Sequence, residues 1–341
     1  MKKTCIYYIA MLLLTLFTVV LCVSIGSVAI PLNDTFEVIK SLVLGREIDS
    51  SIPLSSIIES VRLPRVLCVA LVGASLSICG AAMQGLLKNP LADGSTLGVA
   101  SGASLGAIIA IAFSITIPAL PFAGTMVMAI LFAFLSLVII MGLAYKLDGS
   151  LSTNTIILIG VIYSMFISSI MSMVIALAPD KVQHITFWTM GSLAGSDYKN
   201  ALVLLISLLI CGSILILNAN ELNAFAVGED NARNIGVPVK KVKLTVLISA
   251  SVLIGVCVSV GGTIGFVGLV IPHMLRFITG PNHKILLPTC VFGGAIFLML
   301  CDLVARVILS PMEIPIGVIT SFIGAGLFIY IFYITRRNSY A

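Results

Sequence analysis

Four charged side chains stand inside long apolar segments, where charges are costly. Asp302 and Arg306 lie four residues apart in the run CDLVARVIL, so on a helix they share a face and can pair. Arg62 and Arg65 open a second apolar run. Three arginines at one mouth of a helix bundle predict a site for carboxylates of a substrate or a protein, for which Glu313 can compete. Arg306 alone also fits a side chain that snorkels to a membrane surface.

Polar side chains gather in two short connections between apolar runs. The first connection holds Gln84, Asn89, Asp93 and Ser95, and the second holds Ser152, Thr153 and Asn154. Polar residues at helix ends can close a pore, but Asp, Asn, Ser and Thr are also good helix N-caps. Capping is the favoured interpretation for Ser95 and Ser152 taken individually.

The longest polar connection, from Asn218 to Lys243, reads NANELNAFAVGEDNARNIGVPVKKVK. It predicts one short helix over Glu221–Val227, which a glycine ends. A second short helix is predicted to be capped by Asp230 or Asn231 and to stop at Gly236, before Pro238. Short helices across one face of a membrane protein suit the docking of a soluble partner. A solvated, basic loop fits the same residues.

Composition identifies an integral membrane protein. Of 341 residues, 59% are hydrophobic and 10% are charged, and the mean hydropathy is +1.18, whereas soluble domains carry about 25% charge. The net charge of +5 indicates cationic loops on one side of a membrane rather than binding of nucleic acid. The eight cysteines all lie in apolar stretches and the three histidines are scattered. We therefore expect neither a metal site nor a bound cofactor.

Apolar runs of membrane-spanning length predict an all-α fold of about ten transmembrane helices in a single permease domain, residues 1–341. The first run, Cys5–Leu32, is too long for a signal peptide and lacks a cleavage site. A short surface helix is expected near Thr35–Leu44. The later spans are approximately Leu63–Leu87, Thr96–Ile117, Leu120–Tyr145, Asn154–Leu177, Ala201–Leu217, Leu244–Val260, Thr263–Thr279, Ile285–Leu309 and Ile314–Ile334. Small residues between Gly73 and Ala82 are expected to let neighbouring helices approach closely.

Loop charges predict the topology. An even number of spans puts both termini on one side, and basic residues concentrate in the loops on that side, so both termini are expected to be cytoplasmic. The stretch LVGASLSICGA from Leu71 resembles LIGVCVSVGG from Leu253 on a helix expected to run the opposite way. Two inverted pseudo-repeats are common in transporters, although two glycine-rich helices can also resemble each other by chance.

Two motif classes are missing from the sequence. It holds no G-x-x-x-x-G-K-[ST] phosphate loop, so the chain is not expected to bind ATP in that way. Asp302 is the only acidic residue well inside an expected span. An ion-coupled antiporter usually needs several such carboxylates, which disfavours that function.

Several motifs, taken in order, resemble the FecCD family of ABC importer permeases, which import iron–siderophore complexes, haem or cobalamin. They are RLPR (62–65), GAAMQ (80–84), KNPLAD (88–93), ARNIGV (232–237), GTIGFVGLVIPHMLR (262–276), CDLVARVIL (301–309) and EIPIGVIT (313–320). The resemblance covers nearly the whole chain. The sequence departs from the family at Gly94, where many members have proline, so the inner gate is assigned only loosely to Asn89–Ser95.

The resemblance implies ten transmembrane helices, no enzymatic activity and a set of partners. These are a second permease copy or paralogue, two cytoplasmic ATPase subunits that use the ATP, and an extracytoplasmic substrate-binding protein, all at a bacterial cytoplasmic membrane. It implies docking of the binding protein at Arg62, Arg65 and Arg306. It implies coupling to the ATPase through the 221–237 helices (Glu221, Ala226, Gly228, Ala232, Arg233, Gly236) and a gate or pathway at Gln84, Asn89, Ser152, Thr153 and Asn154.

The expected function is ATP-driven import by alternating access, most simply of an iron(III) chelate such as a siderophore complex. Import of haem or cobalamin by the same kind of permease is the alternative. An ion-coupled secondary transporter and a membrane-anchored structural or sensor subunit are further alternatives. A large cytoplasmic connection and about ten spans exceed what anchoring needs.

Overall fold

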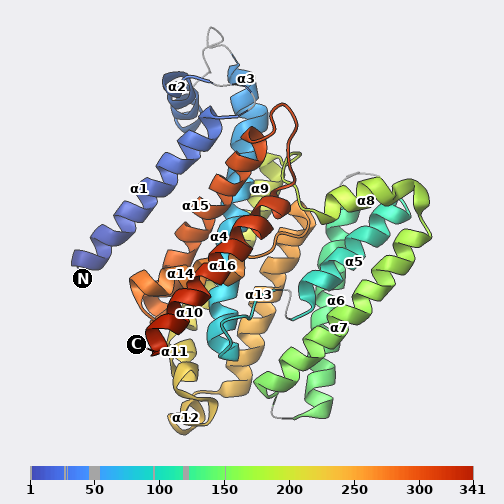
Figure 1. The fold of residues 1–341 in the computed structure, drawn as a ribbon, viewed down its shortest axis with the longest axis vertical. Helices are drawn as coiled ribbons and strands as arrows, with labels where there is room; N and C mark the ends of the chain where they lie inside the picture. The colour runs from blue at the N-terminus through green and yellow to red at the C-terminus, as the bar shows by residue number, and fades with distance from the viewer. Residues whose placement is uncertain are drawn as a thin grey trace.

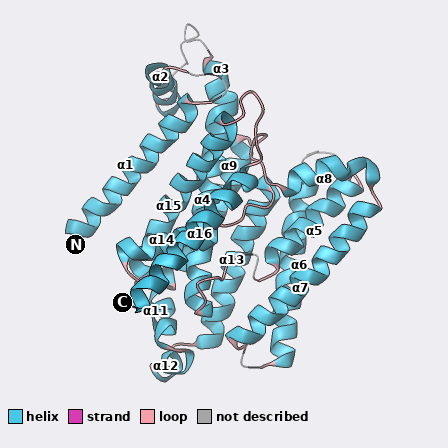
Figure 2. Ribbon diagram, viewed as in Figure 1, coloured by secondary structure: helices cyan, strands magenta, loops and turns pink. Residues whose placement is uncertain are grey.

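The computed structural model describes residues 2–26, 28, 30–45, 54–94, 97–117, 123–149 and 151–340, which fold almost entirely as helices (Figure 2). The long helices are α1 (Lys2–Ser24), α4 (Leu63–Leu87), α6 (Ala123–Leu147), α7 (Thr153–Ala176), α13 (Val239–Gly261), α15 (His283–Val307) and α16 (Ile316–Tyr340). The shorter ones are α2 (Leu32–Val43), α3 (Ser55–Ile57), α5 (Val99–Ala112), α8 (Val182–Thr189), α9 (Tyr198–Ser207), α10 (Ser213–Leu217), α11 (Ala219–Val227), α12 (Glu229–Asn234) and α14 (Val267–Thr279).

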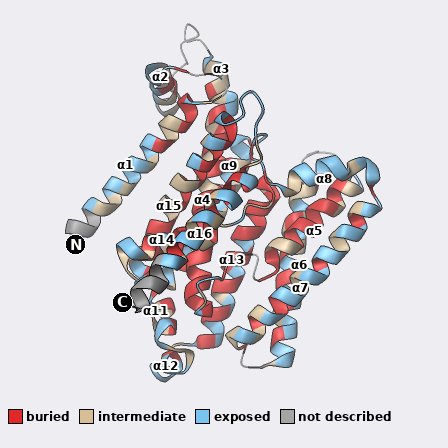
Figure 3. Cartoon of the chain, viewed as in Figure 1, coloured by how far each residue is buried: buried red, intermediate tan, exposed pale blue. Residues whose placement is uncertain are grey.

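Helices α4 and α13 form the centre of the molecule. They are buried along most of their length, whereas α1 and α7 expose most of theirs (Figure 3). Around α4 lie α1, α9, α14 and α15, while α5, α6, α7 and α8 form a second group against α13 (Figure 1). An apolar helix buried all round is a core helix, and one that is apolar but exposed faces lipid. The exposed faces of α1 and α7 therefore lie against the membrane or a partner.

The expected spans agree with the structure to within a few residues at most ends. Among the residues that the structure describes, seven helices are long and apolar enough to cross a membrane, and Val99–Ala112, Val267–Thr279 and Ile316–Ile331 are shorter apolar segments. The fold is therefore the expected polytopic all-α membrane fold. The first span ends at Ser24 rather than Leu32, and a separate helix, α2, begins at Leu32 with Pro31 as its N-cap. Helix α8 was not expected from the sequence.

The two similar stretches beginning at Leu71 and Leu253 lie on α4 and α13, which run in opposite directions (Figure 1). This is the orientation that inverted repeats require. Helix α1 begins, and helix α16 ends, at the same end of the bundle (Figure 1). The relation between two whole inverted halves, and the side of the membrane on which the termini lie, stay predictions.

Glycines let α4 approach its neighbours closely, as expected from the sequence. A Cβ atom on Gly73 would overlap the backbone carbonyl of Gly294 in α15, and one on Gly80 would overlap that of Gly268 in α14. Without a hydrophobic driving force in lipid, helices associate through such close backbone contacts. The central position of α4 thus depends on small residues at defined turns.

Candidate functional site

Two arginines cap the C-terminal end of α1 at the end of the bundle that carries α2 and α3 (Figure 1). Arg62 donates to the carbonyl oxygens of Val23 (2.9 Å), Ser24 (3.0 Å) and Val28, and Arg306 donates to those of Cys22 (2.9 Å) and Ile25 (3.1 Å). The last carbonyl groups of a helix have no partner within it, and cations are favourable there. Both guanidinium groups therefore stabilise the end of α1.

Asp302 links Arg306 to a third arginine, Arg65. Its carboxylate is 1% exposed and accepts hydrogen bonds from Nε (3.1 Å) and Nη2 (2.9 Å) of Arg65. Its second oxygen lies 2.9 Å from Nε of Arg306. Arg65 also donates from Nη1 to Glu313, at 2.8 Å. The expected Asp302–Arg306 ion pair is confirmed, and Arg306 is buried rather than snorkelling.

These three arginines are not free cations at a surface. Arg62, Arg65 and Arg306 are 6%, 7% and 4% exposed, and each donates to oxygen atoms of the chain itself. Their docking role, expected from the resemblance, stays a prediction. Of the three, Arg65 lies nearest to solvent through its partner, because the side chain of Glu313 is 38% exposed.

Replacing Glu313 with glutamine tests whether Arg65 is available to an external carboxylate. The neutral amide competes less for the guanidinium, so the affinity of a binding protein should rise by up to about fivefold, the worth of one exposed ion pair. Affinity is measured with the permease in lipid nanodiscs. Glu37→Gln, at an exposed position on α2, is the matched control. Equal affinities for both variants would contradict the docking role of Arg65.

The opposite end of the bundle carries the two expected short helices, α11 and α12. Gly228 and Gly236 end them with φ of +134° and +91°, a left-handed region that favours glycine. The prediction that Asp230 or Asn231 caps the second helix is wrong, because α12 already begins at Glu229 and has no side-chain cap. The first helix ends at Val227 as predicted but begins at Ala219, two residues before Glu221, and the second ends at Asn234, two residues before the predicted stop at Gly236.

Helix α11 is tied to the start of α15. The side-chain oxygen of Asn223 accepts from the backbone nitrogen of His283 (2.8 Å) and lies 2.9 Å from its Nδ1. The amide of Asn223 donates to Asn282, at 2.9 Å.

Of the residues expected to couple to an ATPase, Ala232 is buried and Glu221 half-buried, so both face the permease. The outward-facing ones are Ala226, Arg233 and Gly236.

The turn before α7 is a capped helix start. The Ser152 hydroxyl accepts from the backbone nitrogen of Thr155 (3.4 Å), which confirms the capping interpretation. The Asp148 carboxylate accepts from the backbone nitrogen of Ser152 (3.1 Å) and from the Thr155 hydroxyl (3.3 Å). Thr153 is half-buried and Asn154 exposed. A gating role for this turn stays a prediction.

Gln84 and Asn89 do not line the cavity described below, but each bonds to residues that do. Gln84 is buried and donates to the carbonyl oxygens of Gly268 (3.1 Å) and Leu269 (3.2 Å), so it joins α4 to α14. Asn89 accepts from the backbone nitrogen of Leu91 (2.9 Å) and thereby shapes the turn after α4. Ser95 lies outside the described residues. The pathway role of Gln84 and Asn89 stays a prediction.

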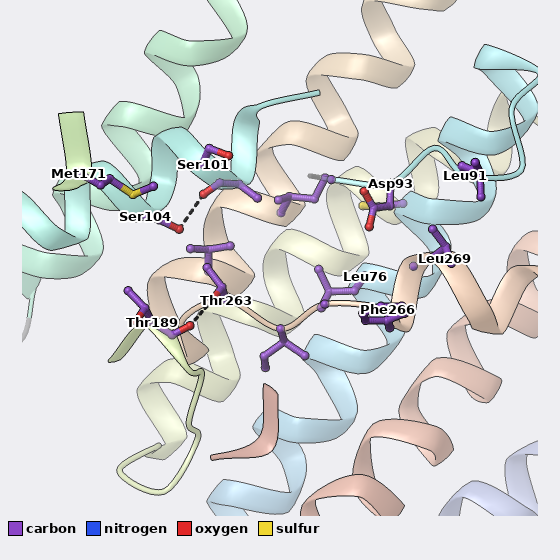
Figure 4. A pocket seen from close by; sticks show the side chains of 18 residues that line it. Leu76, Leu91, Asp93, Ser101, Ser104, Met171, Thr189, Thr263, Phe266 and Leu269 are labelled. Atoms are coloured by element: carbon purple, nitrogen blue, oxygen red, sulfur yellow. Dashed lines mark hydrogen bonds between the residues drawn. The ribbon is translucent and has the colours of Figure 1, made fainter. Parts of the chain in front are cut away.

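A cavity of about 500 Å³ lies between the two groups of helices (Figure 4). Its wall is largely apolar, with a few polar side chains: Asp93, Ser101, Ser104, Thr189 and Thr263. Figure 4 shows Ser104, Thr189 and Thr263 on one side and Asp93 on the other. Sequence reasoning missed both serines and both threonines. The sequence feature that could have identified Ser101, Ser104 and Thr263 is a polar residue within a stretch of small and apolar residues.

The cavity lies where two helices are too short to cross a membrane. Helices α5 and α14 have 14 and 13 residues, so each spans roughly 20 Å of a hydrocarbon layer about 30 Å thick. The chain before each is irregular, and both helices contribute their first residues to the cavity wall. Irregular backbone at membrane depth is tolerated only within protein or beside a polar cavity. Interrupted helices of this kind mark binding sites in transporters.

A wider groove of about 980 Å³ continues from this cavity along α16. The two spaces share Thr189, Thr263 and Gly265 in their walls, and the groove adds Gly317 and Phe322 of α16. Phe322 is 84% exposed. The cavity is therefore open toward one side of the chain rather than enclosed.

Comparison with known proteins agrees with this geometry. The model of the FecCD transport family matches residues 13–334. The chain is 42% identical over 312 residues to the uncharacterized ABC transporter permease protein YvrB of Bacillus subtilis, covering 91% of this chain and 88% of that protein. A solved structure described as an inward-facing conformation of a putative metal-chelate type ABC transporter is 33% identical, with a TM-score of 0.83 and coverage of 95% and 98%.

Relatives with a named cargo differ from one another. The cobalamin import permease BtuC of Halobacterium salinarum is 37% identical, covering 81% of this chain and 73% of its own. The molybdate import permease MolB of Haemophilus influenzae is 34% identical, with coverage of 96% and 95%. The iron(3+)-hydroxamate import permease FhuB of Bacillus subtilis is 36% identical, with coverage of 83% and 72%. The chain belongs to the FecCD transport family and is a membrane permease subunit of an ABC importer, not itself an enzyme.

Proposed function

We propose that the chain forms the transmembrane pathway for a metal chelate, most specifically an iron(III)–siderophore complex, which it admits to the cytoplasm by alternating access. The observation that carries this is the cavity at the interrupted helices α5 and α14, because it places polar side chains at membrane depth. The metal-chelate transporter of similar fold and the hydroxamate relative support the cargo. Haem or cobalamin import is the alternative, supported by the cobalamin relative.

Alternating access requires two states that ligands stabilise differently. We propose that a second permease chain, a copy or a paralogue, closes the open groove along α16 and completes the pathway. Two ATPase subunits act at the end of the bundle that carries α11 and α12, which is then the cytoplasmic side with both termini. The binding protein docks at the opposite end. No cofactor is needed in the permease itself.

The docking surface for the ATPase is the exposed face of α11 and α12. Val227 and Ile235 are apolar but 72% and 73% exposed. They lie on a polar connection outside the apolar spans, so lipid does not cover them, whereas a bound protein would. Both side chains flank outward-facing Ala226 and Arg233. Apolar residues that project from short helices beside cations suit burial in a groove of a soluble protein.

Replacing Val227 and Ile235 with aspartate is expected to lower the amount of ATPase that copurifies with the permease by about tenfold or more. Each substitution puts a charge where the partner would bury an apolar side chain, at a cost of roughly 1–3 kcal/mol. Copurification in mild detergent is the measurement. Asn234→Asp is the control, because Asn234 is the exposed last residue of α12 and is already polar. Unchanged recovery with the double variant would contradict docking at this surface.

The cargo is tested with the transporter in proteoliposomes, together with its copurified ATPase and binding protein. ATP hydrolysis should rise with ferrichrome, a ferric hydroxamate, and not with haemin, cyanocobalamin or molybdate. Stimulation by haemin or cyanocobalamin instead would establish the alternative. Recovery of the permease without any ATPase under mild conditions would favour an ion-coupled transporter and contradict the proposal.

A further inference from the structure

Lys243 joins three segments at the inner end of the bundle. It stands on α13, its side chain is fully buried, and Nζ donates to the backbone carbonyl of Leu151 and to the Glu229 carboxylate, both at 2.7 Å. Glu229 is the first residue of α12, and Leu151 directly precedes the capped start of α7. One ammonium group thus touches both the proposed ATPase-docking surface and the proposed gate turn.

Burial of this lysine is a specific arrangement rather than a consequence of its position. Lys240 and Lys241, one turn or less earlier on the same helix, are exposed. A lysine near a helix end ordinarily extends its stem until the charge reaches water. A buried ammonium is tolerated only with paired, hydrogen-bonded partners, and an unpaired one is strongly destabilising. The carboxylate of Glu229 and the carbonyl of Leu151 supply those partners.

The acceptor on the α7 side is held in an unusual backbone conformation. Leu151 is 3% exposed and has φ of +54°, in the left-handed region, which costs an L-residue other than glycine about 1–2 kcal/mol. Non-glycine residues persist in this region where their surroundings hold them there, often at functional sites. The bond from Lys243 is one contact that holds Leu151 there, and the next residue is the N-cap of α7.

The partner on the α12 side stands on a short helix of its own. Glu229 follows Gly228, whose φ of +134° is open to few residues other than glycine. Helix α12 has only six residues, and it packs against α11 and the first part of α13. The carboxylate of Glu229 pairs with the fully buried ammonium of Lys243. A displacement of α12 is therefore felt at Lys243 through a short, direct ion pair.

We propose that Lys243 is a positioning residue that passes movement of α12 to the first turn of α7, and so couples ATP hydrolysis on the partner subunit to the inner gate. The inference rests on the proposed function, in which α11 and α12 dock the ATPase and residues 152–154 lie at the gate. Both ends of the link are short bonds to one ammonium. Movement of the docking surface that leaves Lys243 in place has to break one of them.

The test uses the full permease with its copurified ATPase in proteoliposomes. A cysteine at the exposed gate position, Asn154→Cys, is labelled with a membrane-impermeant maleimide, without nucleotide and after trapping with ATP and vanadate. Cys5 is replaced by serine in every variant, and the other seven background cysteines are buried. In the otherwise unaltered chain, trapping should change the labelling rate several-fold. With Lys243→Met added, trapping should leave the labelling rate of the cysteine at position 154 nearly unchanged, while the ATPase stays bound.

Two control variants make the result specific. Lys241→Met removes an exposed lysine two residues earlier, and should leave the nucleotide-dependent change intact. Lys243→Arg keeps a cation with several donors and should retain part of it. The double variant Lys243→Met/Glu229→Gln removes both charges of the pair, so neither is left buried and unpaired. It should lose the change without loss of fold, so the test does not depend on the stability of Lys243→Met.

The outcomes separate this inference from the proposed function. Loss of the nucleotide response in both Lys243→Met and the double variant, with bound ATPase, supports the positioning role. A full response in the double variant, or in well-folded Lys243→Met, overturns that role while the importer function stands. If the unaltered chain binds no ATPase or shows no response at position 154, the proposed docking or gate is wrong, and the inference fails with it.

Discussion

Replacing Asp302 with asparagine is expected to remove most of the folded permease. Within the part of the chain that the structure describes, the substitution takes away the one carboxylate paired with Arg306 and leaves Arg65 with Glu313 alone. Breaking a buried ion pair by removing one partner costs about 3–5 kcal/mol, because the other charge stays buried and uncompensated. That is a large share of the stability of an ordinary domain. The measurement is the unfolding temperature in detergent, followed by size-exclusion chromatography.

Two further substitutions isolate the charge effect of Asp302. Asp302→Glu keeps the carboxylate and should lose less stability than Asp302→Asn. Glu313→Gln removes the more exposed partner of Arg65, and should change stability by no more than about 1 kcal/mol. An Asp302→Asn protein that unfolds at the same temperature as the unaltered chain would show that the two arginines find other partners.

The second large effect is expected at Gly80, where α4 touches α14. In Gly80→Ala the new methyl group meets the backbone carbonyl of Gly268, which cannot turn away as a flexible side chain can. Overpacking of a core typically costs 1–3 kcal/mol, and a contact with backbone belongs at or above the upper limit, roughly 3 kcal/mol. We expect a lower unfolding temperature and a larger aggregated fraction.

Gly142→Ala is the matched control for Gly80→Ala. Gly142 also lies within a long helix, α6, but a Cβ atom there meets no atom within 4 Å. The same chemical change should then stabilise the helix by up to about 1 kcal/mol, since alanine is the better helix former. The two variants are thus expected to differ in sign. A stable Gly80→Ala protein would mean that α4 and α14 can move apart without loss of fold.

The fold was largely predictable because a membrane gives long helices a strong signal. Apolar runs alone placed α4 at Leu63–Leu87 without error and most other spans within a few residues. The short helices were harder to locate. The interrupted start of α14 at Val267 depends on tertiary contacts rather than on composition, and the apolar stretch TIGF before it reads as part of the helix.

The candidate site was less predictable, because the partners of its charges are backbone atoms. The spacing of Asp302 and Arg306 predicted their ion pair, which the structure confirms. Nothing in the sequence indicates that Arg62 and Arg306 both point at the carbonyl groups that end α1. Lys243 likewise read as one of several basic loop residues, since its partner on the α7 side is the carbonyl of Leu151.

The cap on α1 has a consequence for the order in which the chain can assemble during synthesis. Ser24 and Arg62 are separated by 38 residues, but Ile25 and Arg306 by 281. A ribosome that adds 5–20 residues per second takes roughly 14–56 s to cover the longer gap. During that time α1 already lies in the membrane without the contacts that Arg306 makes with its C-terminal end. Helix α1 is therefore made early but is fully held in place only after α15 has inserted between it and α4.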